Sequence, residues 1–319
     1  MNAKPLEFEK PIVEMEAELE KMRQKAGSQD IDLGEEISAA EAKLAETRMQ
    51  IYANLSPWQR VQIARHTNRP FMLDYLDHAF EDYCELHGDR VVGDDRAMPG
   101  GMARIGGRSC VVIGHQKGRN TKENLERNFG SAHPEGYRKA MRLMEMADKF
   151  GLPVVSLIDT PGAFPGIGAE ERNIAEAIAR NLREMMGLRV PVVAVVLGEG
   201  GSGGALGIGV ADRILMMENA YYSVISPEGC AAILWKHRKH APEAAEAMKI
   251  AAPDLERIGM VDEVIAEPTG GAHHDHVAAA ANLGAAVARQ LETLCAMPVD
   301  ELMEQRYQKY RNAGEWMEG

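Results

Sequence analysis

The feature that most constrains this 319-residue chain is the stretch from Val190 to Gly209, in which an apolar segment leads directly into a run of glycines. Residues 191–197 are apolar and rich in β-branched side chains, which predicts a buried strand, and residues 205–208 have the composition of a buried helix. Between them lies Gly198-Glu199-Gly200-Gly201-Ser202-Gly203-Gly204. The sequence therefore predicts a strand that ends at Leu197, a glycine turn, and the start of a helix.

Glycines at a strand-to-helix connection have a specific physical consequence. Without Cβ atoms the backbone can adopt positive φ angles, and main-chain N–H groups of the first helical turn can point outward together. The helix dipole adds positive potential at the same place, so the turn suits a phosphate, a carboxylate or an oxyanion. The same glycines would also let a buried helix pack closely on a strand, and the motif alone leaves both interpretations open.

A second unit of the same kind lies about 40 residues earlier in the chain. Residues 154–158 predict a buried strand, residues 159–166 (Asp-Thr-Pro-Gly-Ala-Phe-Pro-Gly) a rigid turn, and apolar residues at helical spacing from Ile174 to Met185 a helix. We call residues 159–166 elbow 1 and residues 198–204 elbow 2. Both elbows are expected at one edge of a sheet, where open α/β folds bind their ligands.

A basic loop follows a third apolar segment, residues 110–113. This loop, Gly114-His-Gln-Lys-Gly-Arg119, belongs to a chain with 36 Lys and Arg against 48 Asp and Glu, a net charge of −12. Basic residues after a buried strand in an acidic protein can attract an anionic ligand, which makes Lys117 and Arg119 candidate substrate contacts. Charge alone does not distinguish such a ligand contact from an ordinary exposed basic loop.

Composition excludes several classes of protein. The acidic net charge disfavours nonspecific binding to nucleic acid or to anionic membranes, and no apolar run reaches the roughly 18 residues of a membrane span. The four cysteines are scattered, so we expect reduced thiols in a cytoplasmic protein. The loop with His273, His274 and His276 has metal-binding composition but no i,i+4 spacing or second cluster, so no metal site is predicted.

Elbow 2 does not match the motifs of two common enzyme classes. It lacks the lysine of a phosphate-binding loop and the Gly-x-Gly-x-x-Gly spacing with a later acid, which disfavours nucleotide binding. Gly201-Ser202-Gly203 lacks the Gly-x-Ser-x-Gly spacing and has no matched histidine, which disfavours a serine hydrolase. What remains is catalysis by backbone donors that stabilise a developing oxyanion.

Three segments differ in pattern along the chain. Residues 1–60 predict a hairpin of two charged helices with narrow apolar stripes, which suits a packing arm or a subunit contact. Residues 61–296 carry the alternating strands and helices of an α/β domain, and residues 297–319 predict a helical tail.

Several motifs in order resemble one known family. Residues 114–119, 134–139, 158–163, 198–204 and 223–230 together resemble the carboxyltransferase α subunits of bacterial acetyl-CoA carboxylase, over essentially the whole chain. Gly207 stands where that family is expected to have alanine, and neither elbow departs from the pattern. The resemblance implies an α/β fold of the crotonase-like (ClpP/crotonase) class, a spiral of repeated ββα units with an N-terminal helical hairpin arm.

The resemblance also implies a reaction and its partners. Carboxybiotin, carried by biotin carboxyl carrier protein in a complex that includes biotin carboxylase, would give its carboxyl group to acetyl-CoA and form malonyl-CoA, the first committed step of fatty acid synthesis. The active site would be shared with a separate β subunit in an α2β2 assembly. This chain would hold no covalent cofactor, and the family's structural zinc would lie only on the β subunit.

The family match assigns roles to the elbows. The backbone N–H groups of Gly203 and Gly204 would form an oxyanion hole for the biotin ureido oxygen, and the neighbouring Gly162, Ala163, Gly201 and Ser202 would shape the substrate cleft. Two alternatives remain. One is a crotonase-type acyl-CoA hydratase that works alone with Glu199 or Glu228 as acid or base. The other is a noncatalytic scaffold that only positions the β subunit.

Overall fold

The centre of the molecule is a single mixed sheet of eight strands, in a computed structural model that describes residues 5–29 and 33–314. The strand order is β1-β2-β3-β4-β5-β6-β8, with β7 paired to the far end of β5. β1 to β3 are antiparallel and the pairs from β3 onward are parallel. The strands are β1 (Glu81–Glu85), β2 (Gly100–Ile105), β3 (Arg108–Gly114), β4 (Val154–Thr160), β5 (Val192–Gly201), β6 (Arg213–Met217), β7 (Tyr221–Ser223) and β8 (Glu263–Ile265).

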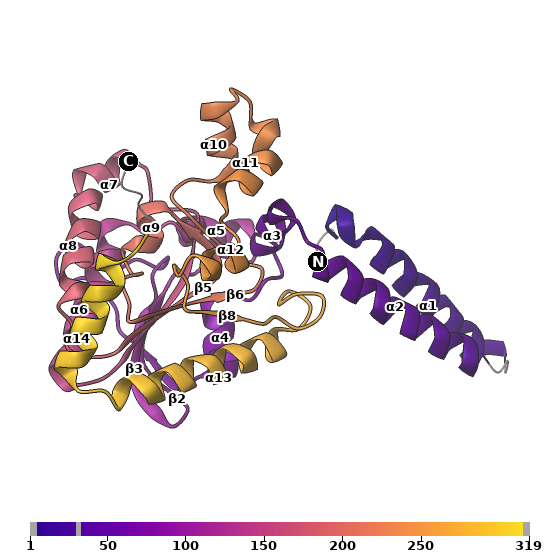
Figure 1. The fold of residues 1–319 in the computed structure, drawn as a ribbon, viewed down its shortest axis with the longest axis horizontal. Coiled ribbons are helices and arrows are strands. Elements are labelled where there is room, and N and C mark those ends of the chain that lie inside the picture. Colours follow the sequence, from indigo (N-terminus) through magenta and orange to yellow (C-terminus); the bar gives the residue numbers. More distant parts are fainter. Residues whose placement is uncertain (1–4, 30–32, 315–319) are drawn as a thin grey trace.

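Helices cover both faces of the sheet, since every residue of β4 and β5 is buried. α6 (Pro134–Phe150) packs on β2 and β3 with α8 (Ile174–Met186) beside it, whereas α13 (His276–Cys295) packs on α4 (Met72–Ala79) and reaches β2, β5 and β8 (Figure 1). The other body helices are α3 (Pro57–Ala64), α5 (Thr121–Glu126), η2 (Asn128–Gly130), α7 (Ile167–Glu171), α9 (Ser202–Leu206), α12 (Ala252–Arg257) and α14 (Val299–Arg311).

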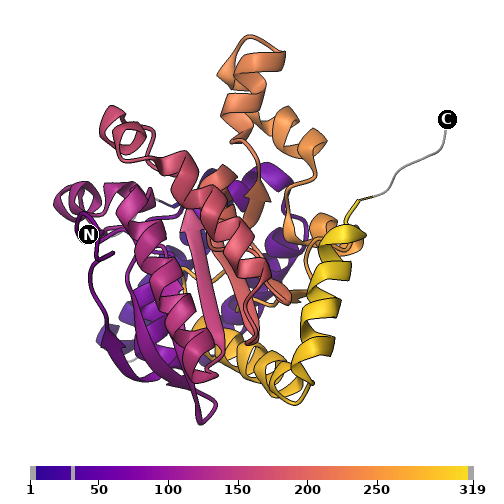
Figure 2. The ribbon, with the colours of Figure 1, turned by 90° about the vertical axis from the view of Figure 1, so that its left-hand side faces the viewer.

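Two helical pairs project from this body. The arm consists of η1 (Glu7–Glu9), α1 (Lys10–Gln29) and α2 (Gly34–Ala53), and α1 and α2 lie side by side as the predicted hairpin (Figure 1). The arm meets the body through a small apolar cluster of Ile12, Tyr52, Leu55 and Ile63. The second projection, α10 (Pro227–Leu234), η3 (Arg238–His240) and α11 (Ala241–Met248), stands above the sheet in both views (Figure 2).

The two elbows lie at the same sheet edge, as the sequence predicts. β4 and β5 are parallel neighbours, with Val154 opposite Val192 and Thr160 opposite Gly200, so elbows 1 and 2 leave the sheet side by side. Residues 100–105 and 108–114 form an antiparallel hairpin. Its two-residue turn has Gly106 and Gly107 at φ +54° and +75°, the left-handed conformation that such a turn requires.

The predicted end of the strand before elbow 2 was wrong. β5 does not stop at Leu197 but continues to Gly201, because residues 199–201 pair with β7. The glycines of elbow 2 do not adopt positive φ angles. In residues 198–204 only Ser202 does, at +51°. The glycines instead allow close approach. A Cβ on Gly201 would lie 2.3 Å from the carbonyl oxygen of Pro161 in elbow 1.

Candidate active site at the two elbows

Elbow 1 and elbow 2 touch through their backbones. A Cβ on Gly204 would lie 2.5 Å from the amide nitrogen of Ala163 and 2.6 Å from the carbonyl carbon of Gly162. No side chain fits between main chains at this distance, which explains the glycine at position 204. The structure therefore brings together all six elbow residues that the resemblance assigned to the site: Gly162, Ala163, Gly201, Ser202, Gly203 and Gly204.

The amides of Gly203 and Gly204 belong to the first turn of α9, where a helix has no backbone acceptor for its N–H groups. Among the described residues, the backbone hydrogen bonds outside helices and strands include none donated by these two amides. Gly203 is half-buried, and a Cβ placed on it would find its nearest neighbour, Ile178, at 3.8 Å. At Gly203 the elbow thus offers an amide donor next to open space, whereas Gly204 is buried against elbow 1.

Side chains behind α9 hold this turn in place. The Tyr137 hydroxyl donates to the carbonyl oxygen of Gly204 at 3.1 Å, and the Asn181 amide donates to the carbonyl oxygens of Tyr137 and Gly207, each at 2.9 Å. Tyr137 and Asn181 are fully buried. Because these contacts use carbonyl oxygens, they fix the backbone of the turn and leave its N–H groups available.

Where the two elbows begin, the structure places a largely buried cluster of charged side chains and one tyrosine, which we call the elbow charge cluster: Arg65, Lys117, Asp159, Glu199, Tyr221 and Glu228. Lys117 Nζ lies 2.7 Å from Asp159 Oδ1 and 2.9 Å from Glu199 Oε1. These three residues stand at the ends of β3, β4 and β5, so parallel pairing brings them together. The Lys117 side chain, a candidate substrate contact, is 12% exposed and held by two carboxylates.

Glu199 is bound on both oxygens. Its Oε2 accepts from Arg65 Nε at 2.7 Å and from the Tyr221 hydroxyl at 2.6 Å, while Lys117 occupies Oε1. Burial opposes ionisation of Glu199, but the charges of Lys117 and Arg65 outweigh it and lower its pKa to about 2. Burial raises the pKa of Asp159, whose Oδ2 has no hydrogen-bond partner. Glu199, which these donors hold ionised, is therefore a poor general acid or base.

Two further candidates also have partners within the protein. The Arg119 guanidinium bonds to the carbonyl oxygens of Thr67 and Arg69, stacks over the Phe71 ring at 4.1 Å and pairs with Asp74. It therefore fastens its loop to residues 67–74, and the structure shows no contact between it and the elbow glycines. Glu228 pairs with Arg65 at 2.5 Å.

An apolar cleft of about 150 Å³ runs along α9. It is lined by Ser202, Leu206, Tyr222, Ser223, Val224, Leu255 and Met260. Val224 is 78% exposed, and Leu206, Ile258 and Met260 are exposed around the same elbow. No hydrogen bond joins the Ser202 hydroxyl to a histidine in the part of the chain that the structure describes, which agrees with the argument against a serine hydrolase.

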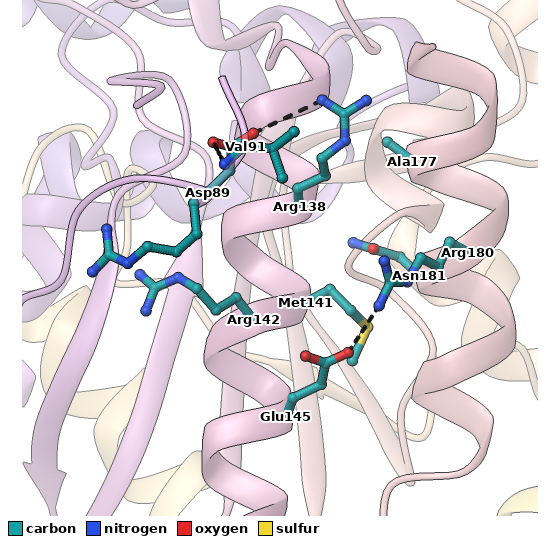
Figure 3. A pocket seen from close by; sticks show the side chains of 10 residues that line it. Asp89, Val91, Arg138, Met141, Arg142, Glu145, Ala177, Arg180 and Asn181 are labelled. Carbon is teal, nitrogen blue, oxygen red and sulfur yellow. Dashed lines mark hydrogen bonds and ion pairs between the residues drawn. The ribbon is translucent and has the colours of Figure 1, made fainter. Parts of the chain in front are cut away.

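A second cavity, of about 290 Å³, lies between α6 and α8 (Figure 3). Four arginines line it, and each donates to an acceptor within the protein; Arg90 donates to the carbonyl oxygen of His87. Arg180 pairs with Glu145 at 3.2 Å, Arg142 donates to the carbonyl oxygen of Gly88, and Arg138 donates to that of Arg172. No elbow residue lines this cavity, so we do not assign it to the active site.

Comparison with known proteins decides the family. The profile of acetyl co-enzyme A carboxylase carboxyltransferase-like proteins matches residues 5–314. The acetyl-coenzyme A carboxylase carboxyl transferase subunit alpha of Geobacter metallireducens is 56% identical over 313 residues, 98% of each chain. The chain belongs to this family. The subunit alpha of Bacillus subtilis is 54% identical over 309 residues, 97% of this chain and 95% of that protein.

Solved structures with low sequence identity show the fold of this chain. Transcarboxylase 12S aligns with a TM-score of 0.59 and 22% identity over 72% of this chain and 42% of that one. The malonate decarboxylase hetero-dimer of Pseudomonas aligns with a TM-score of 0.56 and 16% identity, over 69% of this chain and 89% of that one. The predicted family and the predicted crotonase-like fold are confirmed.

The sequence did not reveal the elbow charge cluster. Lys117 was considered as a ligand contact and Glu199 as an acid or base, but their mutual contact spans 82 positions and that of Arg65 with Glu228 spans 163. The one available signal was that Lys117, Asp159 and Glu199 each follow a predicted buried strand.

A search of the described helices for a membrane-spanning segment finds none of sufficient length and hydropathy.

Proposed function

We propose that this chain is the α subunit of the carboxyltransferase component of acetyl-CoA carboxylase and that it binds carboxybiotin at elbow 2. Carboxybiotin, when bound, supplies the carboxyl group that acetyl-CoA accepts to become malonyl-CoA. The chain contributes the N–H groups of Gly203 and Gly204, which would stabilise negative charge on the biotin ureido oxygen. Elbow 1, through Gly162 and Ala163, would form the neighbouring wall.

The single observation that supports this proposal most is the pair of first-turn amides on α9, unused within the protein and beside open space at Gly203. Backbone donors fixed by Tyr137 and Asn181 cost no reorganisation when charge develops. The nearest ionisable side chains, in the elbow charge cluster, are held by one another. An elbow of this kind stabilises an oxyanion without a side-chain base of its own.

A β subunit would complete the site in an α2β2 assembly. The relatives are named as α subunits, and the elbow is surrounded by exposed apolar side chains such as Leu206, Val224 and Met260, which a partner protein would cover. Biotin carboxyl carrier protein would deliver the substrate, with biotin carboxylase in the larger cytoplasmic complex. We expect the structural zinc of the carboxyltransferase on the β subunit and no covalent cofactor on this chain.

The decisive experiment removes one amide donor. Gly203→Pro deletes the N–H at the second helical position, in the first turn where no intrahelical hydrogen bond is lost, and Gly203→Ala keeps it. With the β subunit present, we expect Gly203→Pro to lower malonyl-CoA formation about 100- to 1,000-fold, the usual effect of losing one oxyanion-hole donor. Gly203→Ala should lose less than about tenfold, because its Cβ meets nothing closer than 3.8 Å.

Assembly is measured on the same variants, since a variant that fails to form α2β2 would lose activity for another reason. If Gly203→Pro assembles and keeps full turnover, the oxyanion-hole proposal is wrong and the scaffold alternative stands. If the isolated α chain forms malonyl-CoA from carboxybiotin and acetyl-CoA without the β subunit, the shared site is wrong. Hydratase activity that depends on Glu199 would establish the other alternative, which the ion pairs of Glu199 argue against.

A further inference from the structure

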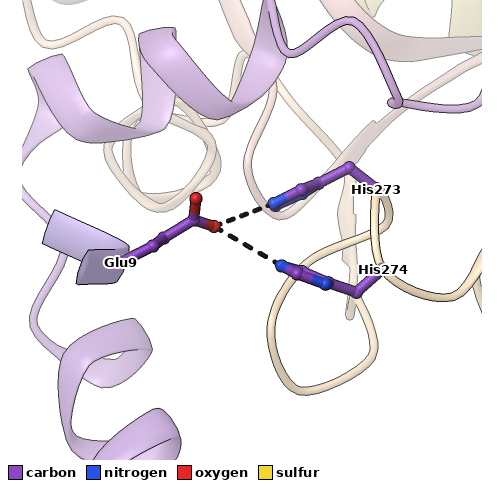
Figure 4. Close-up of side chains that lie close together, drawn as sticks. All are labelled: Glu9, His273 and His274. Carbon is purple, nitrogen blue, oxygen red and sulfur yellow. Dashed lines mark hydrogen bonds and ion pairs between the residues drawn. The ribbon is translucent and has the colours of Figure 1, made fainter. Parts of the chain in front are cut away.

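Outside the elbow charge cluster, three potential metal ligands meet where the arm joins the body. Glu9 comes from η1 at the root of the arm, and His273 and His274 come from the loop before α13 (Figure 4). Glu9 Oε1 lies 3.0 Å from His273 Nε2 and 3.5 Å from His274 Nε2, and the three ligand atoms all lie within 4.8 Å of one another. The side chains of Glu9 and His273 are 5% and 1% exposed.

These separations fit tetrahedral coordination of a small divalent ion. Zinc binds histidine nitrogen and carboxylate oxygen at about 2.0–2.2 Å, which places ligand atoms roughly 3.3–3.5 Å apart. Two imidazoles and one carboxylate form a donor set that zinc and its neighbours in the first transition row prefer over magnesium or calcium. A cavity of about 330 Å³ lined by Glu9, His66, His273 and His274 adjoins the cluster and leaves space for a fourth ligand.

The surroundings hold these side chains in place. The Tyr52 hydroxyl donates to Glu9 Oε1 at 2.5 Å and the amide of Leu6 donates to Oε2 at 2.8 Å, so the carboxylate is oriented from two sides. Such outer partners are typical of metal-binding carboxylates. His273 Nδ1 is buried without a protein hydrogen-bond partner, so Glu9 and not His273 is the ligand that the surrounding protein orients by hydrogen bonds.

We propose that Glu9 Oε1, His273 Nε2 and His274 Nε2 bind one divalent transition-metal ion of the zinc class and that the ion fastens the arm to the body. The ligands come from segments 264 positions apart, so binding would couple their positions directly. This differs from the sequence-based expectation of no metal on this chain. That expectation considered the histidine loop alone and could not include Glu9.

The test uses the full-length α chain without the β subunit, so that the zinc proposed for β does not contribute. The protein is stripped with a chelator and titrated with Zn²⁺ in competition with a chromogenic chelator, and with Co²⁺ to record the absorption of tetrahedral N/O coordination. We expect one site per chain with a Kd below about 1 μM, in the range of specific protein–metal binding.

Three variants locate the site. Glu9→Gln and His274→Ala should each weaken Zn²⁺ binding by more than about 100-fold, beyond the 10- to 100-fold typical of outer partners. His274 is suited to substitution because its side chain is 46% exposed. His276→Ala is the matched control, a histidine of the same segment that bonds to the carbonyl oxygen of Asn68 instead, and it should bind within about twofold of the unmodified chain.

Hydrogen exchange tests whether the ion joins the two segments. Zn²⁺ should slow exchange at residues 7–13 in the unmodified chain and in His276→Ala, but not in Glu9→Gln. Wild-type binding weaker than about 100 μM would overturn the proposal. Binding that Glu9→Gln and His274→Ala leave unchanged would also overturn it, because the ion would then lie elsewhere. So would bound Zn²⁺ without protection of residues 7–13, because the ion would then not join the arm to the body.

Discussion

Glu199 in elbow 2 and Glu9 at the arm junction are both buried carboxylates that accept several hydrogen bonds, but their donors differ. Glu199 is held by Lys117, Arg65 and Tyr221, and two of these three carry a permanent charge at neutral pH. Glu9 is held by Tyr52, His273 and His274, whose ring nitrogens can exchange a proton for a metal ion.

This difference separates a rigid region from an adjustable one. The elbow charge cluster ties three neighbouring strand ends together with charges that persist across physiological pH, which suits backbone donors that must not move. The arm junction joins a projecting hairpin to the body through histidines, whose charge changes with pH and which can bind a metal ion. Four measurements test this difference between the elbow charge cluster and the arm junction, and they follow in order of decreasing expected effect.

The largest effect is expected for Lys117→Met. It leaves Asp159 and Glu199 buried near each other without the cation between them, and breaking a buried ion pair in this way costs about 3–5 kcal/mol. Urea unfolding of the α chain measures the loss. Lys249→Met, in an exposed pair with Glu246, is the control and should stay within about 0.5 kcal/mol. A loss below about 1 kcal/mol for Lys117→Met would contradict a structural role for this cluster.

A smaller effect is expected for Glu9→Gln in the metal-free chain. The amide cannot accept from Tyr52 and both histidines, and a buried donor left without an acceptor costs about 1–3 kcal/mol. The loss should appear as faster hydrogen exchange at residues 7–13, with global unfolding little changed. Glu14→Gln, at an exposed position of the adjoining helix α1, controls for charge removal. Equal exchange in both variants would show that Glu9 does not hold the arm.

The two regions should also lose stability in different pH ranges. Burial lowers the pKa of His66, which stacks on His273, to about 4, so its contribution is complete above its unfolded pKa of about 6.5 and is lost as the pH falls toward 4. The pKa of Glu199 is about 2, so its contribution is lost only between about pH 4.5 and 2. Hydrogen exchange at pH 5 should therefore show a loosened arm junction and an intact elbow.

The effect at the junction is expected to stay below about 1 kcal/mol, because His66 is only half-buried and solvent screens its charge. His66→Gln should flatten the pH dependence of exchange at residues 7–13 between pH 7 and 4. If the dependence is unchanged in that variant, His66 is not the group responsible.

The smallest effect is expected for His274→Ala without metal. Its side chain is 46% exposed and its nitrogen lies 3.5 Å from Glu9, so its loss should change the free energy of unfolding by less than about 0.5 kcal/mol. Thermal unfolding with and without Zn²⁺ compares the two states. A large destabilisation of the metal-free variant would mean that His274 supports the loop by itself, and the contrast with Lys117 would weaken.

Much of the body could be predicted from local patterns. Apolar β-branched runs identified β3, β4 and β5, because strands buried on both faces carry few polar residues. Parallel pairing then placed the two elbows together, as the structure confirms. β1 was missed because only Tyr83 among its five residues is even partly buried, so this edge strand carries no apolar pattern.

The partners of charged residues could not be predicted in the same way. The loop after β3 placed basic residues near the sheet edge where a ligand is expected to bind. Only the tertiary structure shows that Lys117 pairs with two carboxylates and that Arg119 bonds to residues 67–74. The extension of β5 to Gly201 was likewise settled by its pairing with β7, a short strand with little pattern of its own.

The buried strands, the two glycine elbows and the helical arm could be predicted from local sequence, because burial and backbone freedom depend on the types of neighbouring residues. Only the tertiary structure decided that Glu9 meets His273 and His274, and that the amides of α9 have unused hydrogens beside open space. The physical reason is that charge pairing and donor availability depend on atoms brought together across hundreds of positions, which no local spacing records.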